Sequence, residues 1–301
     1  MTIRRHLFTV ALATLAASAA ACGGSSIADG DDEALFQAAL ADYDAMDFAS
    51  ARDKFDQLLT TYPTSQRHDN AGYLAGRCRY ELADYTGAIP VFDAMRAAHP
   101  TSPYIDSAAY FSGRSHFKLA DFATAATDFQ ASVAADGSGV WADNATYYVG
   151  RSHYELGQLT TAISELAAFE TDWASSSYLD NARYYLGRAY FANGAYGDAL
   201  GAFDRVLDDP TSIFADNAQY FIGRTEYAQG QLDLAFADFQ AVPVDYPGSV
   251  YEDNALYWEI RIRVDQANCP AASTLLGTLQ SNYAGSAEIS LAQTYMTGNG
   301  C

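Results

Sequence analysis

The chain has 301 residues, of which 17 are basic and 37 are acidic, and its formal net charge is −20. This charge repels polyanions, which argues against nucleic acid or an anionic membrane surface as a general partner. The four cysteines form no C-x-x-C motif and the five histidines form no cluster at metal-ligand spacing. The sequence therefore predicts no structural zinc site and no other cofactor.

Residues 1–21 are predicted to be an export signal. Arg4 and Arg5 supply a positive start, and the apolar stretch over residues 7–20 is too short to span a bilayer. The signal contains two of the 17 basic residues and no acidic ones, so the mature chain carries a net charge of −22. No later segment has an apolar run of the length that a membrane-spanning helix requires.

The residues that follow the signal resemble a bacterial lipobox. Small residues from Ala19 to Ala21 precede Cys22, and a stretch rich in glycine and serine comes after it. The resemblance implies lipidation of Cys22, with residues 22–31 as a flexible linker, and the alternative is ordinary cleavage after Ala21. Gly23 carries no acidic inner-membrane retention signal, which implies an anchor in the outer membrane on its periplasmic face.

From Asp32 onward the sequence repeats with a period of 36 or 37 residues. Asp-Asn-Ala or a close variant begins at Asp69, Asp106, Asp143, Asp180, Asp216 and Asp253. Self-similarity at this length indicates stacked supersecondary units. The predicted units are 32–68, 69–105, 106–142, 143–179, 180–215, 216–252 and 253–289, followed by a cap over residues 290–301.

Each unit is predicted to contain two helices. In the fifth unit, Asp180 is expected to cap the first helix, Gly194 to end it and Pro210 to close the second. A small residue of the second helix and a large one four positions later recur in every unit, so both columns are predicted to lie in the core. The small column is Ala51, Ala88, Ala125, Ala162, Ala199, Ala235 and Ala272, and the large column is Phe55, Phe92, Phe129, Leu166, Phe203, Phe239 and Leu276.

This pattern resembles the tetratricopeptide repeat. The residues at or near its signature positions are Gly187, Tyr190, Tyr196, Ala199, Phe203 and Pro210. The resemblance implies an all-α solenoid of about seven helix-turn-helix units whose first helices look into a concave groove. The first unit has Ala39-Leu40 in place of Gly-Arg and the last has Glu259-Ile260-Arg261, as expected of end caps.

The first helices carry a ladder of asparagine, tyrosine and arginine. These residues recur at i, i+3 and i+7 and therefore share one helical face, which the resemblance places in the groove. The predicted groove-binding residues are Asn70, Tyr73, Arg77, Tyr110, Arg114, Asn144, Tyr147, Arg151, Asn181, Tyr184, Arg188, Asn217, Tyr220, Arg224, Tyr257 and Arg261.

Two roles are open for this ladder. Arginine forks and tyrosine rings suit recognition of an extended peptide, a carboxylate or a sugar. Alternatively, each arginine pairs with the aspartate of an adjacent unit while each tyrosine fills the space between units. Leu40 stands in place of the arginine in the first unit, which favours some binding role in the central units.

The remaining cysteines and histidines are interpreted structurally. Cys269 and Cys301 are predicted to form a disulfide that ties down the end of the solenoid in an oxidising compartment, and Cys78 to be a small buried hydrophobe. His116 and His153 occupy equivalent positions, but no acidic or cysteine partner is expected in register, so they are interpreted as surface or packing residues rather than a metal pair.

The sequence contains no G-x-S-x-G, H-E-x-x-H or P-loop motif, so we expect no enzyme. Lipobox, linker and repeats together resemble two envelope families, the lipoprotein subunit of the β-barrel assembly machine and the Tol–Pal-associated periplasmic coordinator. The resemblance implies a lipid-anchored scaffold for outer-membrane or envelope biogenesis, which binds envelope proteins or extended peptide segments through its groove. The alternative is a lipoprotein that binds glycan, peptidoglycan or a small ligand.

Overall fold

The computed structural model of the chain describes residues 30–209 and 211–301. Over these residues it contains fifteen α-helices and no β-strand. The predicted signal, Cys22 and most of the predicted linker lie outside the described residues, as does Pro210. The helices are α1 (Asp31–Asp44), α2 (Phe48–Thr61), α3 (His68–Glu81), α4 (Tyr85–Ala98), α5 (Ile105–Lys118), α6 (Phe122–Ala135), α7 (Ala142–Glu155), α8 (Leu159–Asp172), α9 (Leu179–Ala192), α10 (Tyr196–Leu207), α11 (Ala215–Ala228), α12 (Leu232–Asp245), α13 (Glu252–Asp265), α14 (Cys269–Asn282) and α15 (Glu288–Gly298).

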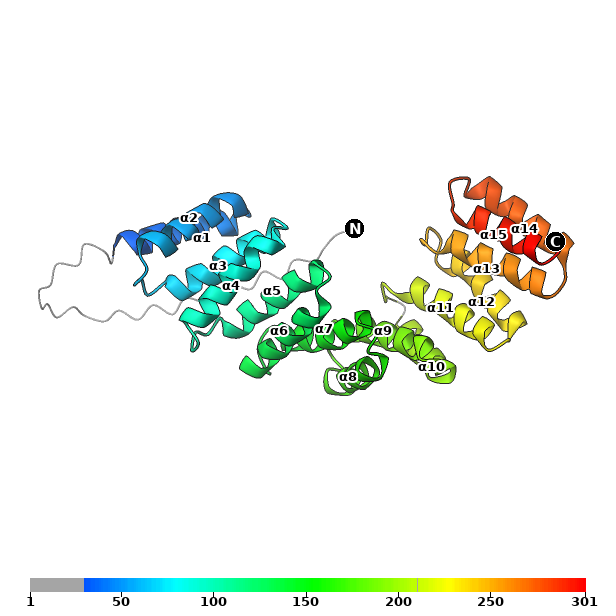
Figure 1. Cartoon of the computed structure of the whole chain (residues 1–301), viewed down its shortest axis with the longest axis horizontal. Coiled ribbons are helices and arrows are strands. Elements are labelled where there is room, and N and C mark those ends of the chain that lie inside the picture. The colour runs from blue at the N-terminus through cyan, green and yellow to red at the C-terminus, as the bar shows by residue number, and fades with distance from the viewer. Residues whose placement is uncertain (1–29, 210) are drawn as a thin grey trace, which may run out of the picture.

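The helices form seven consecutive pairs that stack from α1 at one end to α14 near the other (Figure 1). Each helix packs against the next one along the chain, and α15 packs against both α13 and α14. Each predicted unit corresponds to one pair, and the closing helix begins at Glu288, two residues before the predicted cap. Within the described part of the chain, no helix is long and apolar enough to cross a bilayer.

A residue in the left-handed backbone conformation follows the first helix of every pair. In unit five this residue is Gly194, with φ at +77°, as the sequence predicted. The left-handed conformation ends the helix and lets the chain reverse within a short turn. The equivalent residues are Met46, Ala83, Ala120, Gly157, Gly230 and Ala267.

Asp180 does not cap the first helix of its unit, so this prediction was wrong. The N-cap position of α9 is Tyr178, and Asp180 lies in the first turn. Aspartates at the equivalent position reach forward to the next unit, where Asp143 Oδ2 accepts a hydrogen bond from Ser176 Oγ at 2.6 Å. The same contact joins Asp69 to Ser102 and Asp216 to Ser249. The carboxylate is thus engaged by a hydroxyl about 33 residues away, which local capping rules do not consider.

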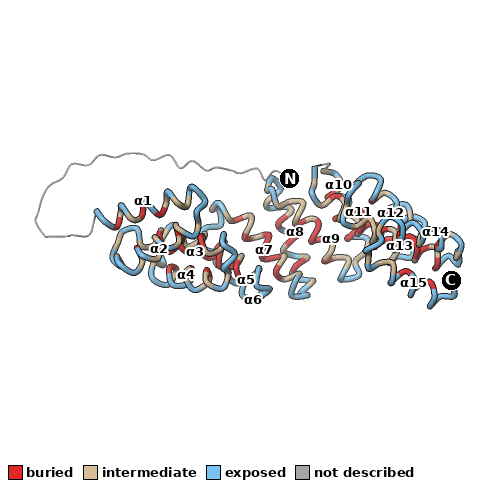
Figure 2. Tube along the Cα trace, turned by 90° about the horizontal axis from the view of Figure 1, so that it is seen from above, coloured by how far each residue is buried: buried red, intermediate tan, exposed pale blue. Residues whose placement is uncertain are grey.

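The two predicted core columns are buried between the helices (Figure 2). All alanines of the small column are fully buried, and so are all large residues except Leu276, which is half-buried beside the end of the stack. Gly187 leaves room for Phe203, since a Cβ at this position would lie 2.5 Å from the ring. In unit seven the position of Gly187 is taken by the larger Ile260, which is buried, and the position of Phe203 is taken by the smaller Leu276.

The first helices of the pairs lie on the inner side of the curved stack. First helices of neighbouring units contact each other directly, as α3 does with α5, α7 with α9 and α9 with α11. The second helices pack mainly on the first helices on either side of them. Closer spacing on one side bends a stack of repeats toward that side, so the ladder lies on helices of the inner side.

Candidate functional site

Five of the six ladder tyrosines are buried between units, and Tyr257 of the last unit is half-buried. Tyr110 and Tyr147 are fully buried, and Tyr73, Tyr184 and Tyr220 expose at most 9% of their surface. Each packs against the aromatic residue just before the first helix of the next unit, and the rings are stacked in every pair except Tyr147–Tyr178, where they are tilted by 39°. The pairs are Tyr73–Tyr104, Tyr110–Trp141, Tyr147–Tyr178, Tyr184–Phe214 and Tyr220–Tyr251, with ring centroids between 4.6 and 5.3 Å apart.

The ladder arginines lie between aromatic rings of neighbouring units. The Cζ of Arg114 is 4.7 Å from the ring centroid of Tyr148 in the next unit and 5.7 Å from that of Tyr80 in the preceding one. A cation over an aromatic face contributes about 0.5 to 2 kcal/mol, with the larger values where water is excluded. The corresponding rings are Phe117 and Tyr185 for Arg151, Tyr154 and Phe221 for Arg188, Phe191 and Trp258 for Arg224, and Tyr227 and Tyr295 for Arg261.

Hydrogen bonds connect most members of the ladder. Arg114 Nη1 donates to the Tyr110 hydroxyl at 2.7 Å, and Asn144 Nδ2 of the next unit donates to the same hydroxyl at 3.3 Å. Arginine-to-tyrosine bonds of the same kind join Arg77 to Tyr73, Arg151 to Tyr147 and Arg224 to Tyr220. Burial also raises the pKa of Tyr147 and of Tyr110, which keeps these hydroxyls neutral.

The structure contradicts the expected pairing of ladder arginines with the aspartates of adjacent units. Within the described residues, the carboxylate partners are glutamates four positions further along the same helix, in the pairs Arg77–Glu81 at 3.0 Å and Arg151–Glu155 at 3.6 Å. Residues four apart are neighbours on a helix surface, and several of the aspartates are already bonded to serine hydroxyls.

The first unit, which lacks the arginine, also lacks its aromatic partner. Phe111 receives Arg77 at 3.7 Å from the preceding unit, and it stands 34 residues after that arginine. The residue 34 positions after Leu40 is Leu74, and both leucines belong to the same apolar core. Arginine and ring are therefore replaced together by an apolar pair, so Leu40 no longer supports a binding role for the ladder.

Family models match two parts of the chain. Residues 28–137 match the YfiO model, described as an outer membrane lipoprotein, and residues 112–177 and 167–213 match a tetratricopeptide-repeat model. The sequence resembles two envelope families, and the YfiO model describes the one that contains the lipoprotein subunit of the β-barrel assembly machine. No curated protein matches the sequence.

Solved structures share the architecture over most of the chain. The C-terminal part of a TPR repeat-containing protein from Cytophaga hutchinsonii is 18% identical with a TM-score of 0.67, covering 85% of this chain and 98% of its own. The chain therefore has the fold of a tetratricopeptide-type helix-turn-helix solenoid. A tetratricopeptide repeat protein from Parabacteroides merdae is 12% identical with a TM-score of 0.59, covering 90% and 99%. PilW, a widely conserved type IV pilus biogenesis factor, is 16% identical with a TM-score of 0.59, covering 76% and 100%.

One rung of the tetratricopeptide ladder differs from the others. Arg188 makes no hydrogen bond and no ion pair with the described residues, and the ring centroids around its Cζ lie between 5.1 and 5.6 Å away. Its side chain is half-buried, and the position four residues later is Ala192 rather than a glutamate. The N–H groups of the Arg188 guanidinium therefore remain without an acceptor among the described residues, whereas Arg114 donates to the Tyr110 hydroxyl.

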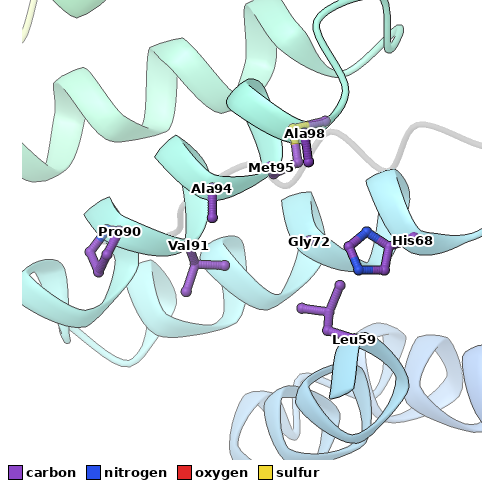
Figure 3. Close-up of a pocket in the computed structure, with 8 residues that line it drawn as sticks. All are labelled: Leu59, His68, Gly72, Pro90, Val91, Ala94, Met95 and Ala98. Atoms are coloured by element: carbon purple, nitrogen blue, oxygen red, sulfur yellow. The ribbon is translucent and has the colours of Figure 1, made fainter. Parts of the chain in front are cut away.

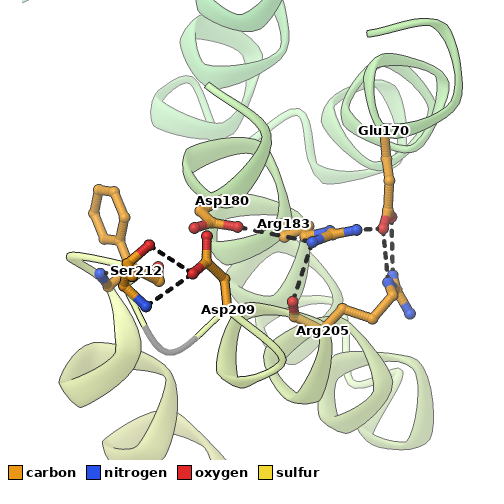
Figure 4. Close-up of polar contacts among 8 residues, drawn as sticks. Glu170, Asp180, Arg183, Arg205, Asp209 and Ser212 are labelled. Carbon is orange, nitrogen blue, oxygen red and sulfur yellow. Dashed lines mark hydrogen bonds and ion pairs between the residues drawn. The ribbon is translucent and has the colours of Figure 1, made fainter. Parts of the chain in front are cut away.

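On the outer side, an ion-pair network joins units four and five (Figure 4). Glu170 of α8 accepts hydrogen bonds from Arg183 of α9 at 2.9 Å and from Arg205 of α10 at 2.8 and 3.0 Å. Burial acts to raise the pKa of Glu170, but the bonds from Arg205 and Arg183 lower it on balance. The sequence analysis missed this network because its three residues do not recur from unit to unit.

The outer side also has apolar recesses between second helices. The first, of about 340 Å³, lies between α2 and α4 with α3 as its floor (Figure 3). A similar recess of about 380 Å³ lies two units further along, between α6 and α8. The residues that line the first one include Leu59, Gly72, Pro90, Val91, Ala94 and Met95.

The histidines have acidic partners, which the sequence analysis did not expect. His153 Nδ1 lies 2.6 Å from Glu165 Oε2, and His116 Nδ1 lies 3.2 Å from Asp121 Oδ2. His116 Nε2 also lies 3.9 Å from Asp128. Asp128 and Glu165 stand on the second helix of the same unit, twelve residues after their histidines, whereas Asp121 caps that helix five residues after His116. No group of three or more potential metal ligands occurs in the described residues.

The cysteines of the last unit meet at the end of the solenoid. Cys269 at the start of α14 and Cys301 after α15 form a disulfide, with their Cα atoms 5.2 Å apart. The bond closes the chain segment that holds the cap. Cys78 is a fully buried free thiol, as predicted.

Proposed function

We propose that the chain is a non-catalytic envelope scaffold that binds partner proteins along the inner side of its solenoid, with recognition centred on Arg188. The similarity to an outer membrane lipoprotein family and the tetratricopeptide architecture support the scaffold role. In this proposal the ladder has two parts. Most rungs hold neighbouring units together, and the rung at Arg188 meets the partner.

The observation that carries the proposal is the open guanidinium of Arg188. Its neighbours donate to tyrosine hydroxyls of their own helices, as Arg151 does to Tyr147 and Arg224 to Tyr220. Arg188 lacks such a bond among the described residues, although it stands in the same column. A half-buried cation with unused donors on a concave surface suits an acceptor group of a bound polypeptide.

The glycan alternative loses its main support. A sugar ring binds best to an accessible aromatic face, and the ladder tyrosines stack on other rings of the protein and are buried. The half-exposed edges that remain are asparagine and arginine, whose donors suit the acceptors of a polypeptide. We therefore favour a protein partner.

In this proposal the scaffold is lipid-anchored through Cys22 and faces the periplasm. The match to the outer membrane lipoprotein family model begins at residue 28, within the predicted linker of residues 22–31. An anchored scaffold samples partners in the same membrane at a high effective concentration, which suits modest affinities on the inner surface.

The test uses the full-length lipidated protein in native envelopes, with crosslinking followed by purification and mass spectrometry. We expect Arg188→Met to reduce partner capture at least fivefold while leaving the thermal midpoint within a few degrees. The matched control is Arg52→Met, which removes the same charge from an arginine that pairs only with its neighbour Asp53 on the second helix of unit one.

Equal capture by wild type and Arg188→Met would contradict recognition at this rung. Capture lost equally in Arg52→Met would indicate a general charge effect rather than a site. Hydrolytic activity of the purified protein that survives stringent repurification would contradict the non-catalytic role.

A further inference from the structure

Two units contain a histidine on the first helix that faces an acidic residue on the second. His116 faces Asp128 in unit three, and His153 faces Glu165 in unit four. The members of each pair are twelve residues apart, and the two pairs are separated by one repeat of 37 residues. The His153–Glu165 pair therefore joins the two helices of its unit through a donor and an acceptor, while His116 approaches Asp128 to 3.9 Å.

Unit six places two acidic residues at these same positions. Glu226 of α11 replaces the histidine, and Asp238 of α12 stands at the acidic position twelve residues later. Glu226 exposes only 9% of its surface, and its buried Oε2 has no hydrogen-bond donor among the described residues. Asp238 Oδ1 is held by Gln219 Nε2 at 2.8 Å. Two carboxyl groups thus meet where the other units have a donor and an acceptor.

The surroundings of Glu226 add negative charge and no ion pair. Asp204 of α10 acts on it together with Asp238. On α10 itself, Arg205 is bonded to Glu170 of unit four. On the flanking first helices, Arg183 of α9 is also bonded to Glu170, and Arg263 of α13 faces Glu259.

The ionisation of Glu226 reflects this environment. The pKa of Glu226 is raised to about 8, mainly by burial. The hydrogen bond and the charge of Asp238 raise it further, and so does the charge of Asp204. At neutral pH the carboxyl group is therefore protonated and can donate to Asp238, as the His153 imidazole does to Glu165 in unit four.

This carboxyl pair lies on α11 and α12, beside the point where two apolar clusters of the solenoid adjoin. One continuous core runs from unit one to Phe203 and Val206 of unit five and ends at Ile222 of α11. A separate core begins with Tyr220 and continues through Phe239 of α12. Phe221 of α11 packs against both clusters, so apolar contacts continue across α11, and the polar contacts between α10, α11 and α12 add to them.

We propose that the interface of α10, α11 and α12 is a pH-dependent joint, closed while Glu226 and Asp238 share a proton and loosened when that proton is lost. A raised acid pKa means that the folded protein keeps a proton that the unfolded chain gives up above pH 4.5. The closed joint therefore weakens progressively as pH rises from about 4.5, and the loss is complete above about pH 8. In the deprotonated state, two carboxylates and Asp204 repel one another inside a poorly solvated space.

The joint separates the unit that contains Arg188 from the C-terminal units. Loosening it changes the angle between α9 and the inner surface of α11 and α13, so the joint offers a way for pH to alter the binding surface. The joint itself is independent of any partner and can be tested on the purified protein.

The test is hydrogen–deuterium exchange of the full mature chain at pH 6.5 and 9.0, corrected for the intrinsic change in exchange rate. We expect peptides from α11 and α12 to lose at least tenfold in protection at pH 9.0, while peptides from α5 to α8 change less than twofold. Glu226→Gln and Glu226→His should abolish this difference, because an amide or an imidazole donates to Asp238 at both pH values. Glu226→His recreates the pair of units three and four and serves as the matched variant.

Uniform corrected protection across the pH range in the wild type would overturn the proposal, and so would an unchanged pH response in the two variants. Circular dichroism at pH 6.5 verifies that the variants fold. For a readout without substitution, carbon NMR of the side-chain carboxyl groups in the wild type should find one glutamate of α11 titrating above pH 7. Titration of every α11 carboxyl group below pH 6 would also reject the joint.

Discussion

Arg114 and Arg188 occupy equivalent positions in the ladder but differ in their contacts, which makes their substitution by methionine the most informative perturbation. Methionine keeps an unbranched stem between the rings and removes the charge and all donors. Arg114 loses a 2.7 Å hydrogen bond to the buried Tyr110 hydroxyl and a ring contact at 4.7 Å. Arg188 loses only ring contacts longer than 5 Å.

The expected costs follow from these contacts. A hydrogen bond to a charged group contributes about 1.5 to 3 kcal/mol, and a partly desolvated cation–π contact about 0.5 to 1 kcal/mol. Asn144 remains as a donor to the Tyr110 hydroxyl and limits the loss. We therefore expect Arg114→Met to lower the free energy of unfolding by about 2 to 3 kcal/mol and Arg188→Met by less than about 1 kcal/mol.

The assay is urea unfolding followed by circular dichroism, together with hydrogen exchange to locate the loss, because repeat arrays do not always unfold in one step. Partner capture should show the opposite order, with Arg188→Met impaired and Arg114→Met normal once folded. Equal destabilisation by both substitutions, or a larger loss for Arg188→Met, would refute the division between structural and recognition rungs.

Three further predictions follow from other parts of the chain. Cys22→Ser should abolish acylation and move the protein from the membrane pellet to the soluble fraction, and a mutant that resists salt and carbonate washes would show that lipid is not the anchor. Cys269→Ser should destabilise the cap, since a disulfide across a sequence separation of 32 contributes about 3 to 4 kcal/mol in the chain-entropy view, and mass mapping that finds both thiols free in the native protein would remove the basis for it. Burial raises the pKa of Glu259 to about 7, so between about pH 4.5 and 7 the wild type should lose on the order of 3 kcal/mol more stability than Glu259→Gln does, when the urea unfolding free energies of both proteins are measured across this range.

The fold could be predicted from the sequence because its causes recur. The alanine column and the phenylalanine column occupy the same positions in nearly every unit, and a period of 36 or 37 residues places them in the same contact each time. The predictions that failed concern polar groups for which two hydrogen-bond partners compete. Asp180 was expected to cap its own helix, but it lies in the first turn, and at the equivalent position the carboxylate of Asp143 accepts a hydrogen bond from the Ser176 hydroxyl of the next unit.

The sequence shows the ladder as a repeated feature but does not identify the partners of its side chains. A second aromatic column follows the ladder tyrosines by one residue and includes Phe111, Tyr148 and Tyr185. The arginines of the preceding units lie over the rings of this column. Its regular recurrence in the sequence was the pattern from which these contacts could have been predicted. The network of Glu170 with Arg183 and Arg205 occurs once, so no sequence periodicity could reveal it.

The most direct test of the account places a photo-crosslinking amino acid at Ala192, one helical turn after Arg188 on the inner side, in the full-length protein in living cells. The matched position is Ala168, which is also an exposed alanine but lines the outer recess between α6 and α8. The account predicts a discrete crosslinked product containing an envelope protein from position 192 and none from position 168. A product formed from position 168 alone would contradict it.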